Sequence, residues 1–417
     1  VAPEESENVL KTPAIEAENV HKVYDAIASH WNHTRYKAWP RVEAFVRSLP
    51  RHSLVADLGC GNGKNLPHVK EAGGFAVASD ISAPLAQIAA EDGACSSAGA
   101  GAADGPRKGS SSRLAQAQAA SQDVWLSPRR AVVVGATSGI GQGLALRLAE
   151  AGCGVMVVGR SPDRGQALVE ELRRRAAEKA AEQGAECEEK AYSFRQLDAF
   201  SLPDCRQLAN EIQKEGGLDY LVLTQGMATM QGYTPTPVEK GGLDEKLTLH
   251  YYSRALLMTA LAPLLQCSSD GRCLSVLSGG VHSAYANYAE DPELAKGYSL
   301  TKAANCAGFY NDIAVEKLSE EYQGVSFIHA CPGFVATSWG TEMPWLVKRL
   351  VRALQRFGRS KEDAGEYLFR SLYHEEFSEG GCYIVNEFGE KTQKFTALQA
   401  EAKDAVWART KEVLSRF

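Results

Sequence analysis

No stretch of this 417-residue chain reaches the roughly 18–20 uncharged apolar positions that a membrane span requires. The ten cysteines are scattered singly, with no Cys-x-x-Cys pair and no Cys/His cluster, so neither a disulfide framework nor a metal site is expected. Basic residues are not in excess, because the formal net charge is −6, which argues against a protein that coats nucleic acid. No signal or transit peptide is visible in the acidic, polar first residues, and we expect a cytoplasmic protein with reduced thiols.

Composition divides the chain into three parts. Residues 94–124 are rich in Ala, Gly and Ser and low in complexity, which is typical of a flexible linker. They separate a short segment, 1–93, from a longer one, 125–417. The length exceeds that of a typical single domain, so two units of unequal size are expected.

The longer segment opens with a strand, a glycine-rich turn and a helix. Residues 131–148 read AVVVGATSGIGQGLALRL, in which a β-branched run meets glycines spaced G-x-x-x-G-x-G. Gly135 can take the φ angle of a tight turn, while Gly139 and Gly141 let the backbone approach a phosphate without a Cβ atom. With Ser138 and Ile140 between them, they predict backbone N–H groups and a helix N-terminus facing a pyrophosphate.

Apolar strands and helical stretches then alternate to the end of the chain. This alternation predicts an α/β fold with a doubly wound, Rossmann-like parallel sheet. A last strand or hairpin and a terminal helix are expected after residue 380. The six preceding strands are predicted at 131–134, 154–160, 194–200, 218–226, 273–278 and 325–333.

Tyr298 and Lys302 form Y-x-x-x-K in a helix predicted over 298–318, which places both on one helix face. A phenol with its ordinary pKa of about 10 is a poor acid or base at neutral pH, and an adjacent ammonium makes it usable. Such pairs are also common as surface residues, but here a serine, Ser278, ends the preceding strand. The three residues together predict a site that exchanges a proton with a carbonyl or an alcohol.

These motifs resemble the short-chain dehydrogenase/reductase family, with an insertion between Ser278 and Tyr298 similar to that of retinol-dehydrogenase-like members. The resemblance implies that Ser278 polarises the substrate oxygen, although Ser275 and Ser283 lie nearby. His250 falls where the family has a catalytic asparagine, and it either supports a proton-relay water or is a buried helix residue. The remaining cofactor contacts that the resemblance implies are Asp198, Gly226, Pro332, Gly333 and Thr337.

The end of the second strand indicates the cofactor. A dehydrogenase that prefers NAD has an acidic residue there, which accepts from the ribose 2′-hydroxyl. Arg160 occupies this position and suits a 2′-phosphate, so NADP(H) is favoured over NAD(H).

The shorter segment contains a second glycine-rich turn, in DLGCGNGK. Asp57, Gly59 and Gly61 follow a short strand, and Asp80 ends the next one. Residues 20–93 resemble class I S-adenosylmethionine-dependent methyltransferases, and in wording the tRNA wobble-uridine carboxymethyl methyltransferases. The resemblance implies S-adenosylmethionine and tRNA as partners, but it stops after about the second β-α unit. This segment is either a remnant without activity or a module that needs strands from another chain.

Residues 343–360 have an apolar stripe beside a basic one. This pattern fits a substrate lid, a peripheral membrane contact, or a helix packed over the cleft. For the whole chain we predict an NADP(H)-dependent oxidoreductase acting on a carbonyl or secondary alcohol. A lipophilic substrate and a homo-oligomer are compatible with this prediction. The alternatives are an S-adenosylmethionine-dependent tRNA methyltransferase and a non-catalytic nucleotide-binding scaffold.

Overall fold

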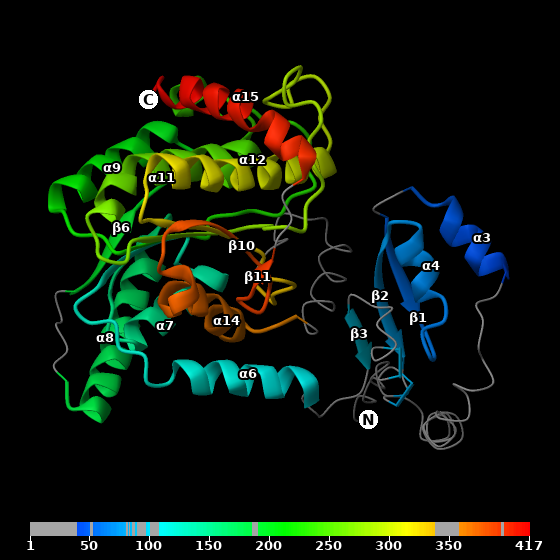
Figure 1. The fold of residues 1–417 in the computed structure, drawn as a ribbon, viewed down its shortest axis with the longest axis horizontal. Coiled ribbons are helices and arrows are strands. Elements are labelled where there is room, and N and C mark those ends of the chain that lie inside the picture. The colour runs from blue at the N-terminus through cyan, green and yellow to red at the C-terminus, as the bar shows by residue number, and fades with distance from the viewer. Residues whose placement is uncertain are drawn as a thin grey trace, which may run out of the picture. The chain divides into compact units, whose positions relative to one another are not determined.

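The computed structural model describes residues 40–50, 53–80, 82, 84–85, 88–89, 97–100, 108–185, 191–337, 358–392 and 396–417. The chain divides into two compact units, Val1–Arg107 and Lys108–Phe417 (Figure 1). Each unit is taken by itself below. Among the described residues, no helix is long and apolar enough to cross a bilayer.

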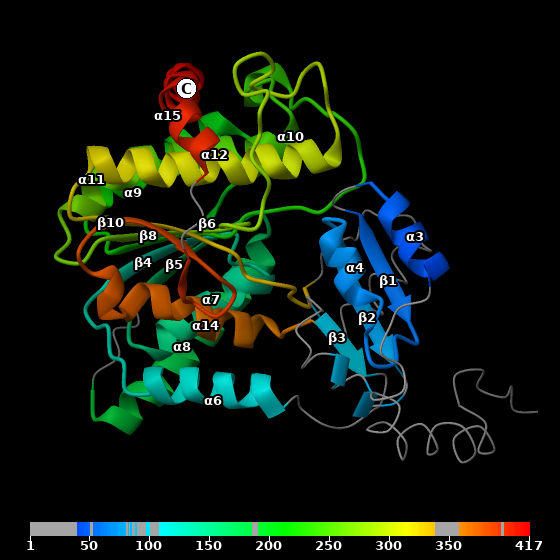
Figure 2. The same cartoon turned by 45° about the vertical axis from the view of Figure 1, so that its right-hand side comes forward.

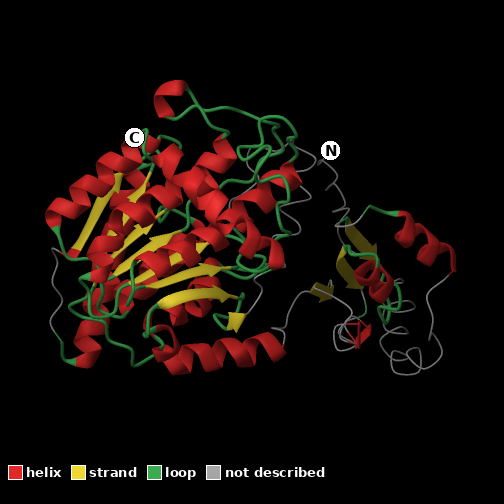
Figure 3. Ribbon diagram, turned by 45° about the horizontal axis from the view of Figure 1, so that its top comes forward, coloured by secondary structure: helices red, strands yellow, loops and turns green. Residues whose placement is uncertain are grey.

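The second unit contains one large sheet (Figure 3). Its strand order is β11-β10-β9-β8-β7-β4-β5-β6. All neighbours are parallel except β10 and β11, which form an antiparallel pair. The order reverses between β4 and β7, which makes this point the topological switch of the sheet. The predicted doubly wound fold and its final hairpin are confirmed. The strands span β4 Arg130–Val134, β5 Gly154–Gly159, β6 Tyr192–Gln196, β7 Tyr220–Leu223, β8 Arg272–Val276, β9 Ser326–Ala330, β10 Gly381–Val385 and β11 Lys391–Thr392.

Helices cover both faces of this sheet (Figures 1 and 2). Alternation along β4 sends Val132 and Val134 to one core, and Ala131 and Val133 to the other. The first core is completed by α9 Leu202–Glu215, α11 Ser253–Gln266, α12 Leu300–Glu321 and α15 Ala397–Leu414. The second is completed by α7 Gly139–Glu150, α8 Pro162–Gln183 and α14 Lys361–Tyr373.

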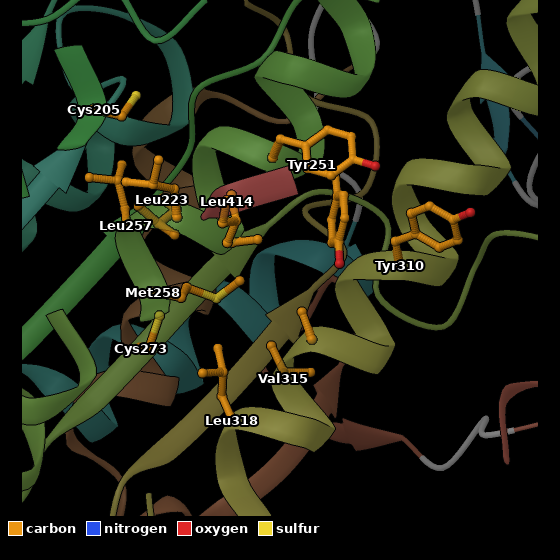
Figure 4. Packing of buried hydrophobic residues seen from close by; sticks show 14 of the residues in the cluster. Cys205, Leu223, Tyr251, Leu257, Met258, Cys273, Tyr310, Val315, Leu318 and Leu414 are labelled. Atoms are coloured by element: carbon orange, nitrogen blue, oxygen red, sulfur yellow. The ribbon is translucent and has the colours of Figure 1, made fainter. Parts of the chain in front are cut away.

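The first core joins segments far apart in the sequence (Figure 4). Leu223 of β7 and Cys273 of β8 lie in it with Met258 of α11, Val315 of α12 and Leu414 of α15. All five side chains are buried. The C-terminal helix is therefore part of this core and packs against α12.

Helix boundaries follow their capping residues. The Ser201 side chain accepts from Asp204 N at 3.3 Å and begins α9, with Pro203 in the first turn. The helical stretch after β7 is divided into α10 Glu245–Leu247, a π-helical turn Thr248–Tyr252 and α11. Single π turns within helices are frequent at functional sites.

The predicted linker 94–124 is wrong over its second half. Residues Lys108–Ser121 form helix α6, which packs against α14 in the second unit (Figure 2). Arg147 Nη2 donates to Ser121 O at 2.6 Å, and Ser121 Oγ hydrogen-bonds the Glu366 carboxylate. The low-complexity composition predicted a linker here. The alanine, glutamine and leucine residues at 114–120 are nevertheless good helix formers.

The first unit is a smaller parallel sheet in the order β1-β2-β3. The predicted strands are confirmed as β1 Leu54–Leu58 and β2 Phe75–Asp80. The third, β3 Ser97–Ala100, was not predicted, since its residues belong to the supposed linker. Helices α3 Pro40–Ser48 and α4 Leu66–Glu71 accompany the sheet, and a small core around Val46, Leu66 and Val69 joins them.

Candidate active site

The predicted site residues of the second unit lie at the carboxyl ends of the parallel strands. Each strand from β4 to β9 contributes one loop to this edge. The loops carry Gly135 after β4, Arg160 after β5, Asp198 after β6, Gly226 after β7, Ser278 after β8 and Pro332-Gly333 after β9. In doubly wound sheets, ligands bind at this edge, where the strand order reverses.

The turn after β4 is closed tightly enough that its glycines cannot be replaced. Gly135 has φ +82°, and a Cβ atom there would lie 2.6 Å from Gln225 N. A Cβ atom at Gly141 would lie 2.3 Å from Thr224 Oγ1 and 2.7 Å from Gly135 O. The helix N-terminus is therefore held against the end of β7. Ser138 is the N-cap residue of α7, and its side chain makes no capping hydrogen bond.

The loop after β9 approaches the same turn. A Cβ atom at Gly139, which has φ +59°, would meet Thr337 Cγ2 at 3.2 Å. Gly333 has φ +69° and faces Glu387. The structure thus brings Thr337 to the glycine-rich turn, 198 positions earlier in the sequence. Residues 343–357 of the predicted amphipathic helix lie outside the described residues.

Ser278 has a free hydroxyl, whereas its two neighbouring serines do not compete for the role. The Ser278 Oγ atom is shielded from solvent and has no hydrogen-bond partner. Ser275 is fully buried, and its Oγ donates to Asn311 Oδ1 at 3.1 Å. Ser283 is fixed through its backbone, whose N–H donates to Asn305 Oδ1 at 3.1 Å. Of the three, Ser278 has the hydroxyl best suited to a ligand.

Tyr298 lies before the helix in which it was predicted. Helix α12 begins at Leu300 with Ser299 as its N-cap, because the Ser299 hydroxyl accepts from Lys302 N at 3.1 Å. The Tyr298 ring packs edge-on against Tyr233, with centroids 5.8 Å apart. Its hydroxyl is also shielded and has no partner. Burial, and then the negative charges of Asp244 and Glu245, raise the pKa of Tyr298 above its usual 10.

Lys302 is turned toward the backbone that precedes the helix. Its Nζ atom donates to Gly297 O at 2.9 Å. A second ammonium lies near the tyrosine, because Lys246 Nζ is 5.3 Å from the Tyr298 ring centroid. Ser278 lies against Gly308 of α12. The Tyr298 and Ser278 hydroxyls come from loops at one edge of the sheet, and no hydrogen bond joins them.

His250 is a partly buried, neutral residue of the π-helical turn. Desolvation of its imidazole, followed by the charges of Arg254 and Lys246, lowers its pKa to about 3. Its Nε2 atom accepts from Met227 N at 3.0 Å. A Cβ atom at Gly226 would lie 3.5 Å from the same nitrogen. His250 thus holds the loop after β7 through the amide of Met227.

The two residues expected at the adenosine end differ in how they are engaged. The Asp198 carboxylate accepts from Lys240 Nζ at 2.6 Å and from Phe200 N at 3.2 Å. The Arg160 guanidinium lies 5.6 Å from the Phe200 ring centroid, and its side chain is exposed. Asp198 is thus already paired, while Arg160 is accessible to an anion.

Arg254 was missed from the sequence although it ties the strand ends together. It is fully buried, and its guanidinium donates to Leu223 O at 3.2 Å, Gln225 O at 2.5 Å and Val276 O at 3.0 Å. Burial lowers its pKa to about 9. An arginine within the apolar helix SRALLMTALAPLL was the signal that could have identified it.

In the first unit, the glycine-rich turn is engaged by its own acid. Gly61 N donates to Asp80 Oδ2 at 2.7 Å, and Ser82 N donates to Asp80 Oδ1 at 2.9 Å. Asn65 Nδ2 donates to Asp57 Oδ2 at 3.2 Å. Gly59 has φ +79° and open space around it. The Asp80 carboxylate therefore binds the turn of its own unit.

A cavity of about 450 Å³ lies at the opposite, amino edge of the large sheet. Its cations are already paired, Arg195 with Glu215 at 3.0 Å and Arg129 with Asp270 at 3.1 Å. It contains none of the predicted site residues. In the described part of the chain, no group of His, Cys, Asp and Glu is arranged to hold a metal ion.

Comparison with known proteins separates the two units. A tRNA (carboxymethyluridine(34)-5-O)-methyltransferase of Arabidopsis thaliana is 48% identical over 86 residues, which are 21% of this chain and 21% of that protein. This match confirms the predicted resemblance of the N-terminal segment. It also shows that the chain spans about a fifth of that relative.

The second unit matches over a longer stretch. An oxidoreductase of Emericella variicolor is 30% identical over 251 residues, covering 57% of this chain and 67% of that protein. An oxidoreductase of Emericella nidulans is 32% identical over 210 residues, covering 50% and 59%. A solved structure from Mycobacterium paratuberculosis shares the fold, with a TM-score of 0.51, 19% identity, and coverage of 71% and 97%. The model of the short chain dehydrogenase family matches residues 129–344, and the chain belongs to that family.

Proposed function

We propose that the chain transfers a hydride between NADP(H) and a carbonyl or secondary alcohol at the carboxyl edge of its large sheet. The proposal rests on one observation. The tight turn Gly135–Gly141 and two shielded hydroxyls without partners, those of Ser278 and Tyr298, come from loops at the same edge. Buried polar atoms are normally satisfied, so such hydroxyls mark places where a ligand completes the bonding.

The residues present fit a nicotinamide dinucleotide. A Cβ atom would meet backbone atoms at Gly135, the Thr337 side chain at Gly139, and both Thr224 Oγ1 and backbone at Gly141. The N-terminus of α7 faces that turn and would hold the pyrophosphate, while Thr337 would orient the nicotinamide carboxamide. When bound, the nicotinamide supplies or accepts the hydride.

Tyr298 is the proposed acid and base, and Ser278 the group that polarises the substrate oxygen. The tyrosine hydroxyl donates its proton to the oxygen of the carbonyl as the alcohol forms. The surroundings of the Tyr298 phenol oppose its ionisation, since burial and the charges of Asp244 and Glu245 raise its pKa. The ammonium of Lys302, released from Gly297 O, would provide the compensating positive charge. Reaction in the alcohol-to-carbonyl direction needs this compensation most.

Preference for the phosphorylated cofactor is assigned to Arg160. Its guanidinium is accessible beside Phe200 at the end of β5, where an acid would repel a 2′-phosphate. A lipophilic substrate is part of the proposal only through the retinol-dehydrogenase-like insertion between Ser278 and Tyr298.

The test is NADPH oxidation by the full chain with a panel of aldehydes and ketones. Tyr298→Phe should lower kcat by about a hundredfold or more while leaving NADPH binding intact. Tyr233→Phe, which changes the neighbouring ring, is the matched control and should stay within about threefold. NADPH binding without turnover of any carbonyl would favour a non-catalytic nucleotide-binding scaffold instead.

A second candidate function belongs to the first unit. Its favouring observation is the 48% identity to a tRNA methyltransferase. Binding of S-adenosylmethionine, with methyl transfer to tRNA, would support it. We rank it below the oxidoreductase, because the match covers only 21% of that relative and Asp80 already binds Gly61.

A further inference from the structure

Two histidines and an aspartate form a buried network around the backbone of Ser278. His329 of β9 lies 2.5 Å from Asp312 of α12, between Nδ1 and Oδ1. His282, four residues after Ser278, places Nε2 3.2 Å from Asp312 Oδ2. Gln399 of α15 donates to the same oxygen at 2.8 Å. Asp312 and His329 are fully buried, so the network is a costly feature unless every member is satisfied.

The network binds both sides of the Ser278 peptide. Ser278 N donates to His329 Nε2 at 3.1 Å. Ser278 O accepts from His282 Nδ1 at 3.0 Å. Gly308 makes room for this arrangement, because a Cβ atom there would lie 2.5 Å from Ser278 Oγ and 2.6 Å from the His282 ring. Three elements and one glycine thus converge on a single residue.

These contacts define the protonation of each ring. A carbonyl and a carboxylate only accept hydrogen bonds, so His282 donates from both nitrogens and is an imidazolium. His329 accepts at Nε2 and donates at Nδ1, so it is neutral. Burial opposes the charge on His282, but the hydrogen bond and charge of Asp312 outweigh it and raise the pKa of His282. Burial lowers the pKa of His329 despite Asp312.

We propose that His282 and His329, joined through Asp312, are positioning residues that hold Ser278 in place for the substrate oxygen, and that His282 must be protonated to do so. This inference rests on the proposed function of Ser278. The other titratable groups that face the network are Arg254 of α11, whose charge acts on His329, and Cys382 of β10, whose thiol is buried near Asp312.

The direction of the pH dependence follows from the raised pKa of His282. Its protonated form is favoured by the fold, so its contribution is complete below the ordinary pKa of 6.5. The contribution is lost as the pH rises through the raised pKa of the folded state. At alkaline pH, kcat should therefore lose the contribution that depends on Ser278. The substrate KM should change less than kcat.

The activity test uses the full chain with saturating NADPH. His282→Gln should lower kcat by about tenfold to a hundredfold and flatten the alkaline decline, with NADPH affinity within twofold. His329→Gln keeps one acceptor and one donor and should retain most activity, whereas His329→Leu should not. Asn305→Ala, which alters only the neighbouring Ser283 contact, is the control whose pH profile should match the native chain. An unchanged alkaline decline in His282→Gln would overturn the proposal.

A measurement independent of activity separates this proposal from the proposed function. Nitrogen NMR of the nine histidines should show, at pH 7, one doubly protonated ring that His282→Gln removes. It should also show one neutral Nδ1–H ring that His329→Gln removes. A neutral His282 overturns the network even if carbonyls are reduced. Full activity of Ser278→Ala overturns the positioning role while leaving Tyr298 in place. If no carbonyl turns over, the proposed function fails and the positioning role falls with it.

Discussion

The chain contains two glycine-rich turns after parallel strands, and their surroundings differ. After β1, the amide of Gly61 is already bound by Asp80 at 2.7 Å, and Gly59 has open space around it. After β4, a side chain at Gly135 or Gly141 would strike the end of β7. The second turn also shares its edge with loops from five further strands.

This difference shows what a local motif can and cannot specify. Both turns form because glycine permits positive φ after a strand. Among the described residues, the second turn is joined by an acid/base candidate, Tyr298, a polar partner, Ser278, and an accessible cation, Arg160. A glycine-rich turn therefore becomes a site when the rest of the fold supplies chemistry to the same edge.

The largest expected effect comes from filling the second turn. Gly141→Val should weaken NADPH binding by about a hundredfold or more, because its side chain collides with Thr224 and with Gly135 O. Gly59→Ala is the matched change in the first turn, where space is open. It should leave NADPH affinity unchanged in a fluorescence titration. Equal losses from both variants would show that the first turn takes part in cofactor binding.

The attachment of α6 to the dehydrogenase unit gives the next effect. Arg147 Nε lies 3.0 Å from Glu366 Oε2, and both side chains are nearly buried. Glu366→Ala should lower the free energy of unfolding by about 2 kcal/mol, because Arg147 and Ser121 lose their partner. Glu362→Ala, on the exposed face of the same helix, should cost at most about 0.5 kcal/mol in urea unfolding. Equal losses of unfolding free energy for Glu366→Ala and Glu362→Ala would mean that α6 does not unfold cooperatively with the rest of the second unit.

A smaller effect is expected on the preference for NADPH over NADH when Arg160 is replaced. Arg160→Ala should raise the Kd for NADPH by about tenfold and leave that for NADH within twofold, since only NADPH has the 2′-phosphate. Arg174→Ala removes an arginine of α8 that is paired with Glu171 and Glu178, and should change neither. Parallel weakening of both cofactors by Arg160→Ala would contradict the assigned role.

The smallest effect on reduction is expected in the first unit. Asp80→Asn weakens the bonds from Gly61 and Ser82, so the exchange of these two amides with solvent should accelerate. The rate of carbonyl reduction should stay within about twofold. A larger change would mean that the first unit contributes to the reductase site.

Local patterns predicted most of the fold. The apolar run Ala131–Val134 and the glycine-rich turn after it predicted β4 and the start of α7. The start of α12 was misplaced by two residues, because Ser299 captures the amide of Lys302 and leaves Tyr298 outside. Composition does not predict helix α6, because the contacts that stabilise it come from α7 and α14, which are distant in sequence.

The site was predicted in its glycines and in the order of its loops, but not in its supporting network. His282, Asp312 and His329 lie 30 and 17 positions apart in sequence, so no local spacing connects them. They meet because β9 is the parallel neighbour of β8 and α12 packs against β9. Arg254 depends in the same way on strand ends that only the folded sheet brings together.

The most direct test of the two-turn comparison is calorimetric titration of the full chain with NADPH and with S-adenosylmethionine. We expect one NADPH site, which Gly141→Val removes, and no binding of S-adenosylmethionine. Binding of S-adenosylmethionine without NADPH would contradict it, because the turn after β1 would then be the working site.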